Sequence, residues 1–371
     1  DYDAQCPGKG VFNITYSKDV IATLNEIDFY ANGIYGIIIT FTSPFNILAN
    51  LFSGAILLTK ELRNPFNVIL SIMCLNSAIA LLIKASTVYR QMTIVECNAE
   101  TMTYSLSLHF LITFNCWVPF RAAYTWMTAF LTALRYRALR SKGKWEASYS
   151  LIGVGSVAIL IIAAAAGIPL YMVNIIGSFS IPEACGRPAL PGEEELTVPG
   201  TMWDPRFFDN GCELFNINQI VSGIFHNTLP SLVLLVATIM LAIELGKASK
   251  GHNAVTARSA KSNDDAVNAA RMLSVVAILT LLSELPQGIV SLAIIFFPLG
   301  FQFNYVEKLT RVWITIQLFS TTCNLLIYLA MSRNFRKAVF SMFCCCLRKT
   351  KLSSLVASVI SVTTVVKQGR F

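Results

Sequence analysis

The sequence predicts an all-α protein, a bundle of seven transmembrane helices. Three observations lead to this fold class: the composition, the number of apolar blocks and the charges between those blocks. The chain has 371 residues, of which 54% are hydrophobic and only 13% are charged, and its mean hydropathy is +0.59. A soluble domain needs more polar side chains than this to cover its surface.

Seven apolar blocks follow one another along the chain, each long enough to cross about 30 Å of hydrocarbon as a helix. The chain has no short-period repeat and no long low-complexity linker. The predicted divisions are an extracellular tail (1–30), a membrane domain (31–331) and a C-terminal segment (332–371). The predicted helices are residues 31–59, 66–90, 105–137, 148–173, 216–246, 267–297 and 307–331.

The charges between the blocks predict the orientation in the membrane. The segments between successive blocks lie alternately on the two sides of the membrane. Those on the side of the N-terminus hold 7 Lys and Arg and 15 Asp and Glu, whereas those on the side of the C-terminus hold 20 Lys and Arg and 5 Asp and Glu. Lysine and arginine mark the cytoplasmic side. We therefore expect a multi-pass plasma-membrane protein with its N-terminus outside and its C-terminus inside. Beside a membrane, the basic tail indicates contact with anionic lipid rather than with nucleic acid.

The outer side is strongly acidic, and this acidity has two interpretations. Glu193, Glu194 and Glu195 form a run before the fifth block. Such a surface either keeps an exposed segment soluble or attracts a cationic ligand. The outer tail also contains the sequon Asn13-Ile14-Thr15, which makes Asn13 a candidate for glycosylation.

Cysteines lie on both sides of the predicted membrane. Four of the ten are in outer segments, where disulfides form, and four cysteines allow three pairings. On the inner side, a cluster beside basic residues suits palmitoylation, with plain thiols as the alternative. The outer four are Cys6, Cys97, Cys185 and Cys212, and the inner cluster is Cys344, Cys345 and Cys346.

The sequence argues against enzymes and cofactor proteins. It has only three His, none at metal-ligand spacing, no phosphate-binding glycine loop and no Gly-x-Ser-x-Gly. A retinal protein needs a lysine within its last helix, and the last block has only Lys308 at its outer edge. We therefore expect no enzyme activity, no cofactor and no metal.

Several motifs, taken in order, resemble those of rhodopsin-like G-protein-coupled receptors. The segment Ser332–Arg336 resembles the start of the short amphipathic eighth helix of that fold. The other motifs are Asn50, Leu134-Arg135-Tyr136, Pro230, Pro286 and Asn324-Leu-Leu-Ile-Tyr328.

A narrower resemblance covers roughly residues 30–343. The segments Glu96-Cys97, Arg121 to Arg135 and Glu284-Leu-Pro286-Gln287-Gly288 are similar to nematode srw serpentine receptors and to invertebrate myosuppressin and FMRFamide-type neuropeptide receptors. This resemblance implies a receptor for an extracellular peptide, cationic and amidated like the RFamides. It would signal to heterotrimeric G proteins and bind arrestin through its Ser- and Thr-containing tail. A chemosensory receptor for a small molecule and a membrane transporter remain the alternatives.

The resemblance also implies roles for individual residues. It assigns activation and G-protein coupling to Arg135, Tyr136, Pro230, Pro286, Asn324 and Tyr328. The two prolines bend their helices, as hinges or as static kinks. Leu134 stands where the family usually has the acid that restrains this arginine. Asn76 stands where the family usually has an aspartate, so no sodium site is expected.

The resemblance implies one disulfide on the outer side, between Cys97 and Cys212. Cys116 is the competing partner of Cys212, although it lies within the third block. Cys6 and Cys185 are then left as a second pair. The asparagines Asn50, Asn76 and Asn324 lie in three different helices, where amides can bond across a helix bundle.

The candidate ligand site centres on intramembrane charge. Arg121 precedes Arg135 by 14 residues, about 21 Å along a helix, and therefore lies well inside the membrane. In the fold of the resembling family, the position of Glu284 faces that of Arg121, so we expect a buried ion pair. The alternative is that each contacts water or ligand separately. The candidate ligand contacts are Lys84, Arg121, Glu193, Glu194, Glu195, Trp203, Glu284 and Gln287.

Overall fold

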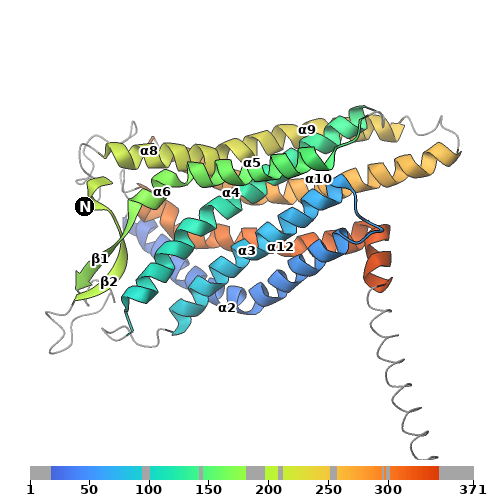
Figure 1. Cartoon of the computed structure of the whole chain (residues 1–371). Helices are drawn as coiled ribbons and strands as arrows, with labels where there is room; N and C mark the ends of the chain where they lie inside the picture. Colours follow the sequence, from blue (N-terminus) through green and yellow to red (C-terminus); the bar gives the residue numbers. More distant parts are fainter. Residues whose placement is uncertain are drawn as a thin grey trace, which may run out of the picture.

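The computed structural model describes residues 18–93, 101–141, 145–180, 197–207, 212–250, 257–294, 296–297 and 301–341. In this part of the chain, seven long helical rods run side by side, and a two-stranded β-hairpin lies at one end of the bundle (Figure 1). We call this end the hairpin end. At the opposite end, the tail end, residues 333–341 form a further helix.

The first three rods are single helices, and the first is longer than predicted. Its 40 residues span about 60 Å, twice the hydrocarbon thickness. It begins 13 residues before the predicted start at residue 31, so residues 18–30 of the predicted tail are helical. An apolar pattern marks only the part of a helix that crosses lipid, whereas Asp19 favours a helix start outside it. The bounds are α2 Lys18–Leu57, α3 Pro65–Thr93 and α4 Tyr104–Arg140.

The fourth and fifth rods are interrupted. The fourth breaks at Gly167, two residues before Pro169. The fifth contains a turn of π-helix that ends just before Pro230, whose missing N–H cannot continue the regular ladder. The bounds are α5 Tyr149–Ala166, α6 Ile168–Val173, α8 Glu213–Val221, η2 Ser222–Thr228 and α9 Leu229–Lys250.

The last two rods are α10 (Ala257–Ala293) and α12 (Glu307–Met331), the latter preceded by the π-helical η4 (Gln302–Val306). After α12, the helix over residues 333–341 turns away from the bundle (Figure 1). Arg336 binds the last turn of α12, because its Nη1 donates to two carbonyl oxygens at 2.8 and 2.7 Å. The eighth helix is therefore present.

The hairpin is an addition that the sequence analysis did not predict. Strand β1 (Asn174–Ser180) pairs antiparallel with β2 (Thr197–Trp203), and the short 3-10 helix η1 (Pro205–Phe207) follows. Ser107 Oγ in α4 donates to a backbone oxygen of β2 at 2.8 Å, which ties the hairpin to the bundle. The connection between the fourth and fifth rods therefore contains regular structure.

Helix α4 is the most central rod, because it packs against α3, α5, α9 and α10. Six described rods have the length and hydropathy of a membrane span. The remaining rod, α4, is more polar because it carries four arginines, Arg121 deep within it and Arg135, Arg137 and Arg140 near its C-terminal end. Large apolar side chains such as Phe41 and Phe319 point outward, which suits a lipid surround. The all-α, seven-helix membrane fold is confirmed.

Polar side chains join the rods in the interior. Asn76 Nδ2 donates to the backbone oxygen of Phe120 at 2.7 Å, and Asn324 Nδ2 donates to the hydroxyl of Tyr124 at 2.8 Å. The expected bonds between helices are thus present for Asn76 and Asn324. The amide of Asn50 instead donates at 2.8 Å to a carbonyl of its own helix.

Candidate functional site

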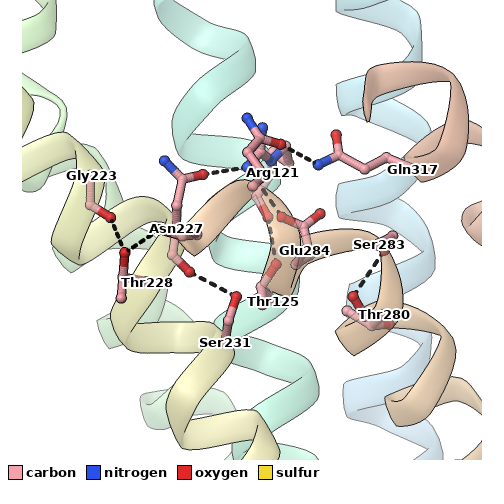
Figure 2. Close-up of polar contacts among 12 residues, drawn as sticks. Arg121, Thr125, Gly223, Asn227, Thr228, Ser231, Thr280, Ser283, Glu284 and Gln317 are labelled. Atoms are coloured by element: carbon pink, nitrogen blue, oxygen red, sulfur yellow. Dashed lines mark hydrogen bonds and ion pairs between the residues drawn. The ribbon is translucent and has the colours of Figure 1, made fainter. Parts of the chain in front are cut away.

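The predicted ion pair between Arg121 and Glu284 is present and buried. Arg121 Nη2 lies 3.1 Å from Glu284 Oε2, and the two side chains are 13% and 6% exposed. The same nitrogen donates to Oδ1 of Asn227, which comes from η2 (Figure 2). A lone charge at this depth would be costly, whereas here a carboxylate neutralises the guanidinium and an amide oxygen accepts a further hydrogen bond from it. The contact joins α4, α10 and the fifth rod.

A close approach of two backbones places Asn227 at this point. Thr228 Oγ1 donates to the backbone oxygen of Gly288 in α10 at 2.8 Å. A Cβ at Gly288 would lie 3.2 Å from the backbone oxygen of Asn227, tighter than ordinary van der Waals contact. Glycine therefore lets α10 and η2 meet. As a result, Asn227 and Glu284 reach Arg121 at the same depth.

The next residues of the same α10 turn contact the seventh rod. Gln287 Oε1 accepts a hydrogen bond from Gln317 Nε2 at 2.7 Å. Pro286, between Glu284 and Gln287, has no N–H to give to the preceding turn. The segment Glu284–Gly288 therefore contacts α4, α12 and η2 around a point where its own helix lacks a backbone bond.

A cavity of about 50 Å³ adjoins the ion pair, between α2, α3, α4, α10 and α12. Lys84 lies in its wall, with Nζ 5.8 Å from the ring centroid of Tyr35 and 5.6 Å from that of Trp117. Both distances allow cation–π attraction. The predicted contacts Lys84, Arg121 and Glu284 thus border one space, and Gln287 bonds to Gln317 in its wall.

Trp203, a hairpin residue that was expected to meet a ligand, has a partner within the protein, and so has the adjacent Asp204. Trp203 stacks on the buried Phe215, with ring centroids 5.2 Å apart. Asp204 accepts hydrogen bonds from the side chain and the backbone N–H of Arg206. These bonds, the side-chain bond first, hold the pKa of Asp204 below its ordinary value. The acid and the aromatic ring stabilise the base of the hairpin.

Cys212 lies at this base, buried and engaged in a disulfide. The competing partner, Cys116, is a free cysteine. Because Cys97 lies outside the described residues, the pairing Cys97–Cys212 stays a prediction. Other predicted residues also lie outside the described part of the chain: Cys6, Asn13, Cys185, Glu193, Glu194, Glu195, Cys344, Cys345 and Cys346.

A second cavity, of about 600 Å³, opens at the tail end. Arg135 and Tyr328 are in its wall. The guanidinium carbon of Arg135 lies 3.9 Å from the ring centroid of Phe66 in α3. Within the described part of the chain, Arg135 has this aromatic face and no ion pair. Tyr136 points elsewhere, accepting a hydrogen bond from Arg140 at 2.7 Å.

The residues of these sites that were not predicted include Asn227, Gln317 and Phe66. A signal existed for the first two, because uncharged polar residues inside a membrane span usually face protein. That signal is weak here, because the spans contain many such residues. Phe66 carried no signal, since an aromatic residue at a helix start is common in membrane proteins.

Comparisons with known proteins agree with this architecture. A family model described as serpentine type 7TM GPCR chemoreceptor Srw matches residues 37–346. The solved structure of squid rhodopsin is similar to the fold, with a TM-score of 0.57 at 14% sequence identity, covering 91% of this chain and 88% of that one. No curated protein matches the sequence significantly.

Proposed function

Because the chain belongs to the Srw family of serpentine seven-helix G-protein-coupled receptors, we propose that it is a plasma-membrane receptor for an extracellular cationic, amidated peptide. The family and the fold are those of receptors, not of enzymes. The hairpin end faces outward in this proposal, because the segments there are acidic and those at the tail end are basic. The transporter alternative is set aside.

The buried ion pair beside the cavity carries the proposal. Arg121 and Glu284 connect the cavity wall to the α10 turn that contains Pro286. A ligand that binds more tightly when this contact is rearranged would favour a different angle of α10 at the proline. Helix α10, with two alternative angles at Pro286, would then couple the ligand site to the tail end.

The outer acidity supports a cationic ligand. In the sequence, the run Glu193, Glu194 and Glu195 falls between the segments that form strands β1 and β2, on the predicted outer side. A field of this sign raises the rate at which cations arrive, and salt screens it over about 8 Å at physiological ionic strength. Deeper in the bundle, the cavity wall contains the cations Lys84 and Arg121, so the cavity itself does not favour a cationic group in the same way.

The cytoplasmic partner binds at the tail end. The 600 Å³ cavity offers Arg135, Tyr328 and the start of the eighth helix to a G protein. Tyr136, Pro230 and Asn324 belong to the same activation route in this proposal. The basic tail with Cys344, Cys345 and Cys346 suits palmitoylation at the membrane, and its Ser and Thr residues suit arrestin binding after phosphorylation.

A panel of amidated peptides ending in Arg-Phe tests the proposal. The receptor would be expressed in cells that report G-protein activation, with the same cells lacking it as control. Activation is expected, and a variant with glutamine at positions 193–195 should respond with slower association but similar dissociation. Absence of activation by every cationic peptide would overturn the proposal. An unchanged association rate in the variant would remove the steering role of the acids.

A small-molecule chemoreceptor is the second candidate. The family description names chemoreceptors, and a cavity of about 50 Å³ suits a small functional group better than a folded peptide. The same reporter cells, tested with small polar molecules, separate the two. Activation by small molecules, with no effect of the glutamines at 193–195, would favour this candidate.

A further inference from the structure

Two residues that line the cavity each have a buried side-chain oxygen with no hydrogen-bond donor among the described residues. These oxygens are Oε1 of Gln317 and Oδ1 of Asn76. The two residues are only 6% and 4% exposed. Their amide nitrogens are already engaged, Gln317 with Gln287 and Asn76 with a backbone oxygen of α4, both at 2.7 Å. The hydrogen bonds of the amide nitrogens fix the orientation of both amides, so each amide oxygen remains without a donor.

A buried acceptor without a donor is rare and costs free energy. Two of them beside one cavity indicate that something with N–H or O–H groups enters it. The cavity is large enough for a few waters or one small functional group. Arg121 borders the same cavity, and both of its side-chain hydrogen bonds to described residues use Nη2, so the guanidinium retains donors for an acceptor.

We propose that this cavity binds a primary carboxamide. Its two N–H groups would bond to Gln317 Oε1 and Asn76 Oδ1, and its carbonyl oxygen would accept from Arg121. Figure 2 shows Gln317 extending from α12 toward the group of side chains around Arg121. One neutral group thereby satisfies donors and acceptors of three rods.

Other common groups fit less well. A carboxylate has no hydrogen to give to the two oxygens. A guanidinium or ammonium has the hydrogens, but it would lie beside Lys84 and Arg121 in a wall with a single carboxylate, Glu284. A hydroxyl satisfies only one of the two oxygens as a donor. Among these ligand groups, only the carboxamide is neutral, donates two hydrogen bonds and also accepts; water has the same capacity and is the occupant that the carboxamide would displace.

The inference rests on the proposed function where it assigns the carboxamide to the amidated end of a peptide. The preference of the cavity itself is measurable without any signalling assay. A suitable set of probes is N-acetyl-phenylalanine amide, its N,N-dimethylamide and its free acid. Trp117, Phe120 and Tyr124 around the cavity suit the phenyl ring. The dimethylamide keeps the carbonyl and the neutrality but has no terminal N–H.

Binding would be followed as the rise in thermal unfolding temperature of the full-length receptor in lipid nanodiscs. The primary amide should bind about tenfold to a hundredfold more tightly than the dimethylamide and the acid. Gln317→Met should remove most of this advantage by weakening the primary amide alone. Ser320→Ala, another change in the cavity wall, should leave the advantage in place.

Equal binding of the primary amide and the dimethylamide to the unaltered receptor would overturn the inference, and this comparison needs no variant to fold. So would tighter binding of the acid. A Gln317→Met receptor that keeps the full advantage of the primary amide would also overturn it. These results are independent of the peptide panel, since failure of every peptide to activate the receptor would leave the amide preference measurable.

Discussion

Two arginines of α4 lie 14 residues apart and are held in different ways. Arg121 has a carboxylate at 3.1 Å and the amide of Asn227. Arg135 has the face of Phe66 at 3.9 Å. An aromatic face attracts a cation by roughly 0.5–2 kcal/mol, whereas removing one partner of a buried ion pair typically costs about 3–5 kcal/mol. The same type of side chain is therefore held firmly at position 121 and held by a contact that is more easily released at position 135.

The spaces beside the two arginines agree with this difference. Arg121 adjoins a cavity of about 50 Å³, and Arg135 borders one of about 600 Å³. Only the larger space admits part of another protein. A strong contact deep in the bundle and a weak one at the tail end suit a receptor in which a ligand rearranges the first and a cytoplasmic partner uses the second.

Breaking the strong contact should have the largest effect. Glu284→Ala leaves the Arg121 guanidinium buried without a carboxylate, so we expect a loss of about 3–5 kcal/mol in unfolding free energy and little receptor at the cell surface. Thermal unfolding and surface labelling measure the two. The double variant that carries both Arg121→Glu and Glu284→Arg exchanges the two charges and should recover part of the loss. If Arg121→Glu and Glu284→Arg each express normally alone and the double variant is no better, the ion pair contributes nothing.

Weakening the contact of Arg135 should affect signalling rather than folding. Phe66→Leu keeps the apolar volume but removes the aromatic face, so Arg135 is released more often. Basal G-protein activation without ligand should rise about twofold to thirtyfold, which corresponds to the cation–π energy. Phe66→Tyr keeps the face and serves as the control. Equal basal activity in both variants would mean that Phe66 only fills space.

The close contact beside Arg121 allows a finer test. Gly288→Ala places a Cβ 3.2 Å from the backbone oxygen of Asn227, where neither backbone yields easily. The ligand response should weaken because α10 moves away from η2. Gly246→Ala is the matched control, because a Cβ there meets nothing within 4 Å, and it should stabilise α9 by about 0.5–1 kcal/mol. Similar responses from the two variants would show that the approach of α10 and η2 is not needed.

Much of this site could be predicted from the sequence, because charge in an apolar helix has few alternatives. Arg121 and Glu284 each need a partner inside the membrane, and each is the only charge near its depth on its helix. The pair was predicted from that need and from the resemblance to rhodopsin-like receptors, in whose fold the two positions face each other. The same argument fails for Arg135, which lies at a helix end where several kinds of partner satisfy a cation, so Phe66 was not expected.

The parts that were not predicted depend on backbone geometry. The π-helix at Ser222–Thr228 carries Asn227 to Arg121, and no hydrophobic pattern distinguishes one wide turn from a regular one. The hairpin has glycines opposite each other, Gly177 and Gly200, and neither of its seven-residue strands alternates apolar and polar residues. The helical extension over residues 18–30 is not apolar enough to stand out from a polar tail.

The smallest effect is expected at a third arginine, which gives the comparison a solvent-exposed reference. The side chain of Arg206 is 79% exposed, and its bonds hold the pKa of Asp204 below the ordinary value. A carboxyl with a lowered native pKa stabilises the fold above its unfolded pKa of about 3.9, and that contribution is lost as the pH falls through the native value. Arg206→Ala should therefore lower the unfolding temperature at pH 7 by much less than Glu284→Ala does, because solvent and salt screen the pair. The difference from the unaltered receptor should shrink at high salt and vanish in acid. A loss as large as that of Glu284→Ala, or one that persists in acid, would mean that burial does not set the strength of these arginine contacts.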